Sequence, residues 1–241
     1  MHKDCVDELG FVRRLQKGMD KKMKRFLLVS GGKTEDDFAK EYISKERFDV
    51  FMAADSGMEF YYRNDLKPDV IVGDFDSVTG EALSFFKKQE GILFRELNPM
   101  KDDTDTESAL RLAIEMGAEE IVLLGATGSR LDHVLGNIEL LGIGLQKKVK
   151  ITIVDKNNRI RMLDTGIRIR KEEQFGKYVS LIPYTEAVEG LTLTGMKYPL
   201  EDFTLRGFCS LGISNEIEDE EAEIRFRKGI LIMIESRDRV E

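Results

Sequence analysis

The chain has 241 residues, enough for one large domain or two modest ones, each with its own core. Its net charge of -8 argues against non-specific nucleic-acid binding, which needs a basic surface. No apolar stretch approaches the length of a membrane span, so we expect no membrane association. The two cysteines, Cys5 and Cys209, are too few for a disulfide framework and lack metal-ligand spacing, which favours a cytoplasmic protein.

The first part of the chain alternates short apolar runs with amphipathic segments, after a charged leader over residues 1–23 to which we assign no function. Strands are predicted at residues 26–30, 50–54, 70–73, 92–96, 121–125 and 149–154. The clearest helix is predicted over residues 104–116, where Thr104 and Glu107 match a capping box. This alternation predicts parallel strands with right-handed crossovers, and therefore a doubly wound, Rossmann-like α/β domain over residues 24–155.

After residue 155 the pattern changes to the period of two that is typical of strands. Residues 191–194 and 224–227 alternate apolar and polar side chains, and Lys228-Gly229 turns into an apolar run at 230–234. Several short strands without helices indicate an antiparallel sandwich or barrel. We therefore expect a second, all-β domain over residues 156–241.

The most informative segment is 69–77, in which an apolar run of strand type stops at Gly73 and opens into Asp74 and Asp76. In an extended backbone these two residues project to the same side, so they could hold one hard cation between them. Ligands of open α/β sheets bind at the carboxyl ends of strands. The alternative is that Asp and Ser simply favour the corner between a strand and a turn.

A second acidic cluster, Lys101-Asp102-Asp103-Thr104-Asp105, follows one helix and one strand later. Two oxygen-rich clusters on adjacent strand ends suit Mg²⁺, which takes a few carboxylates, keeps waters and completes its shell with substrate phosphates. The two clusters together favour chemistry over simple turn preference.

A phosphate-binding turn is predicted at residues 125–133, between a strand and an apolar helix. Small residues there let backbone amides approach phosphate oxygens, and the helix N-terminus adds positive potential. Arg130 supplies a planar fork of donors, while His133 and Asn137 share a helix face that could grip a nucleotide. The alternative is a tight turn with an exposed arginine; the segment is not a Walker P-loop, because no Gly-Lys-Ser/Thr follows.

Several segments occur in a characteristic order over about residues 24–236. They are Asp55-Ser56-Gly57, Lys67-Pro68-Asp69, Gly73-Asp74-Phe75-Asp76-Ser77, Lys101-Asp102-Asp103-Thr104-Asp105, Gly128-Ser129-Arg130-Leu131-Asp132-His133 with Asn137, Gly195-Met196-Lys197-Tyr198-Pro199-Leu200, and Ser210-Leu211-Gly212-Ile213-Ser214-Asn215. In this order they resemble the thiamine pyrophosphokinase family. The order of the set, rather than any single motif, makes the resemblance specific.

The resemblance implies a fold and an activity. The implied fold is an α/β catalytic domain followed by a β-sandwich for thiamine binding and dimerisation, in a homodimer with active sites between subunits. The implied activity is transfer of the pyrophosphoryl group of ATP to the hydroxyl oxygen of thiamine, giving thiamine diphosphate and AMP, with Mg²⁺ as cofactor.

The resemblance also implies roles for individual residues. Asp74, Asp76 and Asp105 would bind Mg²⁺ and, with Arg130, form the catalytic set. The contacts to ATP would come from Lys101, Asp102, Thr104, Arg130, Asp132, His133 and Asn137. The contacts to thiamine would come from Asp55 and Gly57 in the crevice and from Ser214 and Asn215 of the partner subunit. Some members place a tryptophan against thiamine, whereas this chain has no Trp.

Other interpretations of the acidic motif stay open at this point. Asp74-Phe75-Asp76 after an apolar strand also resembles the nucleophile motif of haloacid-dehalogenase-type phosphatases, although two predicted strands precede it here. A DxD-type glycosyltransferase is a further enzyme class. A non-catalytic nucleotide or thiamine sensor would keep the pocket without turnover, but the chain retains every acidic ligand.

Overall fold

The computed structural model describes residues 24–238 except 77, 99 and 101, and these residues fold into two compact units. The first unit extends to Leu140 and includes Lys147–Lys150, and the second contains Leu141–Gln146 and the chain from Ile151 onward. The predicted leader over residues 1–23 lies outside the described residues. Over the part of the chain that is described, the helices are too short or too polar to cross a membrane.

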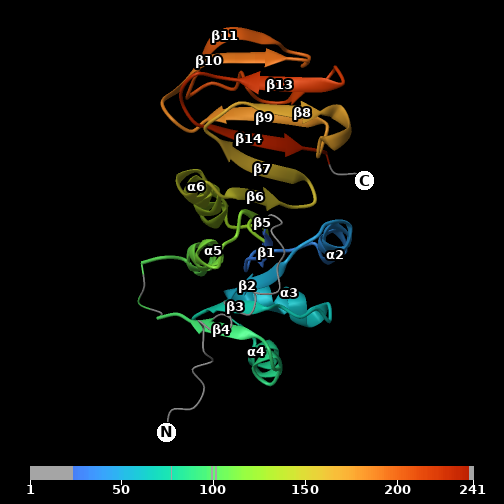
Figure 1. Cartoon of the computed structure of the whole chain (residues 1–241), viewed down its shortest axis with the longest axis vertical. Coiled ribbons are helices and arrows are strands. Elements are labelled where there is room, and N and C mark those ends of the chain that lie inside the picture. Colours follow the sequence, from blue (N-terminus) through green and yellow to red (C-terminus); the bar gives the residue numbers. More distant parts are fainter. Residues whose placement is uncertain (1–23, 77, 99, 101, 239–241) are drawn as a thin grey trace. The chain divides into compact units, whose positions relative to one another are not determined.

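A parallel sheet of five strands forms the centre of the first unit (Figure 1). Its strands are β1 (Arg25–Val29), β2 (Val50–Ala54), β3 (Val70–Gly73), β4 (Leu93–Glu96) and β5 (Glu120–Leu124). All neighbouring pairs in the order β5-β1-β2-β3-β4 are parallel. The strands are mostly buried apolar runs, as expected for a sheet that is covered on both faces. The predicted α/β fold is confirmed.

Helices cover this sheet, with α2 and α5 on opposite sides (Figure 1). The helical elements are α2 (Asp36–Lys45), η1 (Asp55–Gly57), α3 (Met58–Arg63), α4 (Gly80–Lys87), α5 (Asp105–Glu115) and α6 (Leu131–Lys147). Thr104 caps α5 as predicted, because its side-chain oxygen accepts a hydrogen bond from Glu107 N at 3.2 Å. The cap places Asp105 in the first turn of α5, where the helix dipole favours a negative charge.

The order of the strands reverses at β1. From β1 the chain adds β2, β3 and β4 on one side, and then returns to place β5 on the other side. A reversal of this kind leaves a crevice at the carboxyl ends of the two central strands, where ligands of doubly wound sheets bind. The sequence predicted a crevice but not its position, which is between β1 and β5.

The second unit is an antiparallel β-sandwich, which confirms the all-β expectation and decides between sandwich and barrel (Figure 1). Its strands are β6 (Lys150–Val154), β7 (Asn158–Leu163), β8 (Ile167–Arg170), β9 (Tyr178–Pro183), β10 (Ala187–Thr194), β11 (Leu200–Arg206), β12 (Asn215–Glu216), β13 (Glu221–Arg225) and β14 (Leu231–Ser236), with η2 (Lys171–Glu173) between β8 and β9. Within this unit, the strands of one layer have the order β12-β9-β14-β7-β6, and those of the other have the order β11-β10-β13-β8. Buried apolar side chains from both sheets, among them Leu181, Leu191 and Met233, form one core.

A buried ion cluster links two strands of the sandwich. Glu235 on β14 is 0% exposed, and its carboxylate accepts hydrogen bonds from Arg159 at 2.6 Å and Arg161 at 2.7 Å, both on β7. Burial alone would raise the pKa of Glu235, but the hydrogen bond from Arg159 and the charges of both arginines outweigh it and lower that pKa. The cluster therefore stabilises the sandwich through an ionised carboxylate.

Candidate active site

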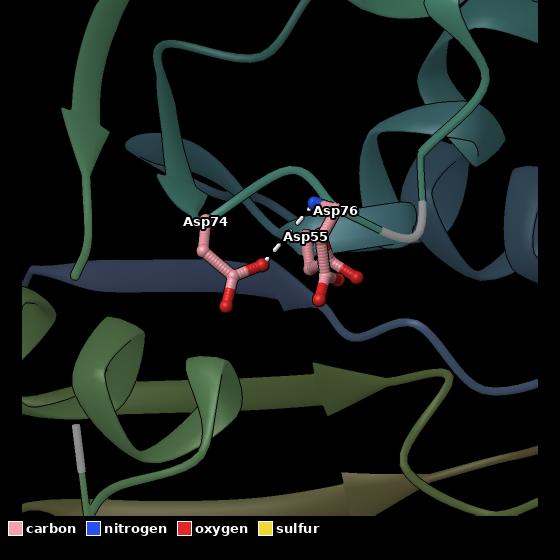
Figure 2. Close-up of side chains that lie close together, drawn as sticks. All are labelled: Asp55, Asp74 and Asp76. Carbon is pink, nitrogen blue, oxygen red and sulfur yellow. Dashed lines mark hydrogen bonds between the residues drawn. The ribbon is translucent and has the colours of Figure 1, made fainter. Parts of the chain in front are cut away.

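Three carboxylates converge at the carboxyl ends of β2 and β3. Asp55 follows β2, and Asp74 and Asp76 follow β3. One oxygen from each side chain lies within 4.8 Å of the other two (Figure 2). Asp55 was predicted to contact the substrate and was not among the predicted metal ligands. Its position beside Asp74 and Asp76 was found only in the structure.

The backbone brings Asp74 and Asp76 together in a way that the sequence did not predict. Extended geometry was expected through residues 74–76, but Phe75 has a positive φ of 63°, so that expectation was wrong. The resulting turn lets Asp76 N donate a hydrogen bond to Asp74 Oδ1 at 3.2 Å (Figure 2). The two carboxylates meet because the chain bends at Phe75, not because they share one side of a strand.

The carboxylates repel one another electrostatically. The pKa of Asp76 is raised, chiefly by the negative charge of Asp74, with further contributions from Asp55 and Asp105. Asp105, at the start of α5, therefore lies near enough to add to the same negative field. A divalent cation would relieve this repulsion, and carboxylate oxygens are the ligands that hard cations such as Mg²⁺ prefer. The residues present thus fit Mg²⁺.

A pocket of about 360 Å³ lies in the crevice between β1 and β5. The loops that follow β1, β2 and β5 line it, together with the first residues of α5 and α6. The predicted site residues that line it are Asp55, Thr104, Asp105, Arg130, His133 and Asn137. Ligand pockets are typically about 300–1,000 Å³, so the volume suits part or all of a nucleotide.

Two glycine-rich loops form one wall of this pocket by packing backbone against backbone. Gly32 N donates to Gly125 O at 2.8 Å, and a Cβ on Gly32 would lie 2.3 Å from the same oxygen. Gly125 has a φ of +65°, and a Cβ there would lie 2.4 Å from Ser30 O. Both positions therefore need glycine, the first for close approach and the second also for its backbone conformation.

A buried hydrogen bond fixes the start of α5 against the end of β1. The hydroxyl oxygens of Ser30 and Thr106 lie 2.6 Å apart, and both side chains are buried. Because Asp105 directly precedes Thr106, this contact also holds the Asp105 backbone at the edge of the pocket. A satisfied buried hydrogen bond of this kind restricts the position of both elements.

The loop and helix after β5 have the polar groups that were predicted, but several are already engaged within the chain. Arg130 Nη2 donates a hydrogen bond to Asp132 Oδ2 at 2.6 Å, and Asp132 Oδ1 also accepts a hydrogen bond from His133 N at 3.0 Å. These hydrogen bonds, first of all the one from Arg130, lower the pKa of Asp132. Asn137 is buried and donates to Ala126 O at 2.8 Å, so its amide supports the loop after β5.

The other predicted residues of the first unit have different positions. Gly57 is buried next to the end of β1, where a Cβ would lie 2.0 Å from Val29 O, and it is not among the residues that line the pocket. Asp102 is exposed in the segment before α5, and Lys101 lies outside the described residues. The contacts of Gly57 with substrate and of Asp102 with ATP stay predictions.

In the second unit, Ser214 and Asn215 lie at the entry to β12. Ser214 is exposed with a φ of 59°, and its backbone N donates to Ser180 Oγ at 3.0 Å. Asn215 is only 7% exposed, and its amide binds the backbone of Tyr198 twice, accepting from N at 3.0 Å and donating to O at 2.9 Å. Asn215 thus holds the Tyr198 segment in place, and contact of either residue with thiamine stays a prediction.

Sequence reasoning missed the loop that follows β1. Ser30, Gly31, Gly32 and Lys33 all line the pocket, and Lys33 brings a second cation to it besides Arg130. The signal was present in Gly31-Gly32 directly after the first strand, because the first βα turn of doubly wound domains is where glycine-rich phosphate loops occur.

Comparison with known proteins relates the chain to one family. The sequence model of the thiamin pyrophosphokinase catalytic domain matches residues 40–153, and that of the thiamin pyrophosphokinase vitamin B1 binding domain matches residues 164–231. Thiamine pyrophosphokinase of Bacillus subtilis is 40% identical over 166 residues, which are 69% of this chain and 77% of that protein. The chain belongs to the thiamine pyrophosphokinase family.

Solved structures of this family have the same fold. The crystal structure of thiamine pyrophosphokinase from Bacillus subtilis superposes with a TM-score of 0.81 at 35% identity, covering 90% of this chain and 100% of that one. The structure of the enzyme from Geobacillus thermodenitrificans gives a TM-score of 0.76 at 33% identity, covering 89% and 98%. The chain is therefore an enzyme, a thiamine diphosphokinase, and the resemblance found in its motifs is confirmed.

The position of Asp74 in the fold argues against the phosphatase alternative. The nucleophile of haloacid-dehalogenase-type phosphatases follows the first strand of the domain, whereas Asp74 here follows β3, two strands later along the chain. The family membership and this position leave the phosphatase interpretation without support.

Proposed function

We propose that the chain transfers the pyrophosphoryl group of ATP to thiamine in the crevice of the first unit, giving thiamine diphosphate and AMP. One observation carries this proposal: three carboxylates within 4.8 Å of one another stand at the same edge of the sheet as a pocket of about 360 Å³. Asp55 belongs to both the carboxylate cluster and the pocket lining. A cation and the phosphates of a nucleotide would therefore meet there.

The pocket would bind ATP through its loops and helix ends. The N-termini of α5 and α6 and the glycine-rich loops offer backbone N–H groups to phosphate oxygens. Arg130 and Lys33 add positive charge at the same pocket. Arg130 would exchange its pairing with Asp132 for phosphate oxygens, to which a guanidinium can donate two parallel hydrogen bonds.

Asp55, Asp74, Asp76 and Asp105 would hold Mg²⁺. The metal, when bound, neutralises charge on the phosphate oxygens and orients the group that is transferred. Four carboxylates in one negative field are a donor set that would suit one or two such ions.

The transfer needs no covalent bond to the enzyme. The hydroxyl oxygen of thiamine forms a bond to the β-phosphorus, the bond between that phosphorus and the oxygen that bridges to the α-phosphorus breaks, and AMP leaves with the bridging oxygen. The hydroxyl proton is released to solvent. Arg130 would bind the oxygens of the transferred group, and positioning of this kind is the main contribution a protein makes to phosphoryl transfer.

The division of labour between the two parts of the chain belongs to the same proposal. Residues 24–155 would form the catalytic domain that binds ATP and Mg²⁺, and residues 156–241 the domain for thiamine binding and dimerisation. Two chains would form a cytoplasmic homodimer in which Ser214 and Asn215 of the partner subunit contact thiamine. The exposed side chain of Ser214 is compatible with such a contact.

Product analysis tests the reaction. Purified protein with ATP, thiamine and Mg²⁺ should yield thiamine diphosphate and AMP in equal amounts by HPLC, and EDTA should abolish both products. Formation of thiamine monophosphate and ADP would refute pyrophosphoryl transfer. Phosphate release from a phosphomonoester, with a phosphorylated Asp74, would support the phosphatase alternative instead.

A further inference from the structure

We propose that Phe75 is a positioning residue for the carboxylate cluster: its packed ring holds the left-handed backbone turn that points Asp74 and Asp76 toward Asp55. The inference rests on the metal site of the proposed function. It assigns a role to the residue between the two aspartates, whose side chain has no oxygen, nitrogen or sulfur atom with which to bind a metal.

The starting observation is the backbone of Phe75. Its φ is 63°, a region that L-residues other than Gly, Asn and Asp rarely enter because Cβ crowds the neighbouring carbonyl. Bulky residues persist there only when the surrounding structure enforces it, and such residues cluster at functional sites. Asp55, the third member of the cluster, also has a positive φ, of 46°.

Packing of the Phe75 ring stabilises this backbone conformation. It packs edge-on against Phe94 of β4, with ring centroids 6.3 Å apart and an interplanar angle of 72°. Lys87 Nζ lies 6.0 Å from the centroid of the ring. Gly73 leaves room for the ring, because a Cβ there would lie 3.2 Å from Phe75 Cε1. Neighbours on β3, α4 and β4 thus pack against the half-buried side chain and offset the cost of the turn.

The turn determines where the carboxylates point. With an extended residue 75, Asp76 would continue away from Gly73 along the strand direction. With the observed turn, Asp76 N instead donates back to Asp74 Oδ1 at 3.2 Å, and both side chains face Asp55 (Figure 2). The Cβ that Gly73 lacks would also lie 3.0 Å from Asp55 Cα, so Gly73 lets the Asp55 backbone approach on the same side.

Direct binding of Mn²⁺, measured by calorimetry on the full chain without substrates, tests this role apart from turnover. Phe75→Ala keeps a Cβ that opposes the turn and removes the ring that enforces it. We expect its Mn²⁺ affinity to fall by about tenfold or more, the range found when a residue supporting metal ligands is removed. Phe75→Gly also removes the ring, but glycine enters the left-handed region without strain, so its affinity should lie between Phe75→Ala and wild type.

Phe85→Ala is the matched control. Phe85 packs its ring against Tyr62 and Phe86, so its loss should lower thermal stability and leave Mn²⁺ affinity at the wild-type value. Wild-type affinity in folded Phe75→Ala would overturn the inference, and so would a Phe75→Gly variant that binds no better than Phe75→Ala. A wild-type protein that binds no Mn²⁺ at all would overturn the metal site of the proposed function and this inference with it.

Discussion

At the scale of single residues, the candidate site is a group of closely spaced carboxylates that the fold holds together despite their mutual repulsion. Asp55, Asp74 and Asp76 lie within reach of one cation, and Asp105 adds to the field that raises the pKa of Asp76. Like charges at this separation destabilise the folded protein unless a cation or a proton compensates them. Side chains arranged at such a cost are more easily explained by binding than by packing, because they are not part of the apolar core.

Neutral replacements of the aspartates should separate catalysis from folding. Asp74→Asn and Asp105→Asn should each lower turnover by roughly 100-fold, since the loss of one stabilising contact to a metal or an oxyanion commonly costs ~3 kcal/mol of barrier. Thermal melting should stay near or above the wild-type value, because each change removes repulsion rather than packing. Asp37→Asn, on the exposed side of α2, serves as the control with unchanged turnover. Near-normal turnover of both site variants at saturating Mg²⁺ would exclude direct metal binding by these residues.

At the scale of elements, the pocket depends on two loops that approach more closely than side chains would allow. Residues 30–33 after β1 and 125–130 after β5 touch through their backbones at Gly32 and Gly125. The parallel pairing of β1 with β5 brings the ends of both strands to the same level, so the loops that follow must meet. Glycines there are a consequence of strand order and not only of turn formation.

An alanine at Gly32 should therefore disturb the pocket selectively. Its Cβ would lie 2.3 Å from Gly125 O, a backbone atom, so one of the loops must move. We expect Gly32→Ala to raise the KM for ATP by about tenfold or more, as losses of roughly 1.4 kcal/mol in binding do, with a smaller effect on the KM for thiamine. Gly80→Ala is the matched control: Gly80 is the first residue of α4, and a Cβ there meets nothing within 4 Å, so alanine should be accommodated without a shift of the backbone. Equal ATP kinetics in the two variants would contradict a role for the close approach.

At the same scale, the ion cluster of Glu235 with Arg159 and Arg161 predicts that the free energy of unfolding depends on pH. The folded-state pKa of Glu235 is lowered, so its contribution is fully present above the unfolded value of about 4.3 and is lost as pH falls through the lowered pKa. Glu235→Gln leaves two partly buried arginines without their carboxylate, which should cost about 3 kcal/mol at pH 7.

Urea unfolding followed by far-UV circular dichroism at pH 7 and at about pH 3 measures this effect. The difference between wild type and Glu235→Gln should be large at pH 7 and should shrink below a pH of about 4.3, because the carboxylate of the unfolded wild-type chain then takes up a proton, which stabilises the unfolded state. Glu172→Gln, on the exposed element η2, should stay within about 0.5 kcal/mol of wild type at both pH values. A difference that does not change with pH would mean that packing, rather than charge, explains the effect.

At the scale of the whole molecule, the proposed ATP and Mg²⁺ site and the predicted thiamine contacts belong to different units. The cluster and the pocket lie in the first unit, whereas Ser214 and Asn215 lie in the sandwich. Asn215 is engaged with the backbone of Tyr198, so Ser214 is the better position at which to disturb thiamine binding without disturbing the fold. A homodimer would let each chain complete the site of the other.

Mixed dimers test that arrangement. Subunits with Asp74→Asn and subunits with Ser214→Arg should each be nearly inactive alone, and mixing them should restore up to about a quarter of wild-type activity, because half of the dimers are mixed and one of their two sites has both halves intact. Sedimentation should show a dimer with an interface above about 1,000 Å². A fully active monomer, or no rescue in verified mixed dimers, would show that each chain builds its own site.

Hydrophobic periodicity determined the elements, because it is a local property of the chain. The strand at residues 50–54 matches β2, and the helix at 104–116 matches α5 with its Thr104 cap. The acidic and glycine motifs likewise singled out Asp74, Asp76 and Arg130; the structure places the two aspartates in the carboxylate cluster and Arg130 in the pocket lining, and their roles stay predictions. The order of the motifs was enough to identify the family.

Contacts between segments far apart in the sequence determined the features of the site that the sequence did not predict. The position of the crevice depends on β5 returning to pair with β1, a contact between residues about 95 positions apart, which no local pattern encodes. The loop at residues 30–33 lines the pocket because of that pairing, and Asp55 joins the carboxylate cluster because β2 pairs with β3. The turn at Phe75 required its ring to meet Phe94, a neighbour on β4. Each of these features comes from the free energy of contacts between distant segments, which only the folded chain brings together.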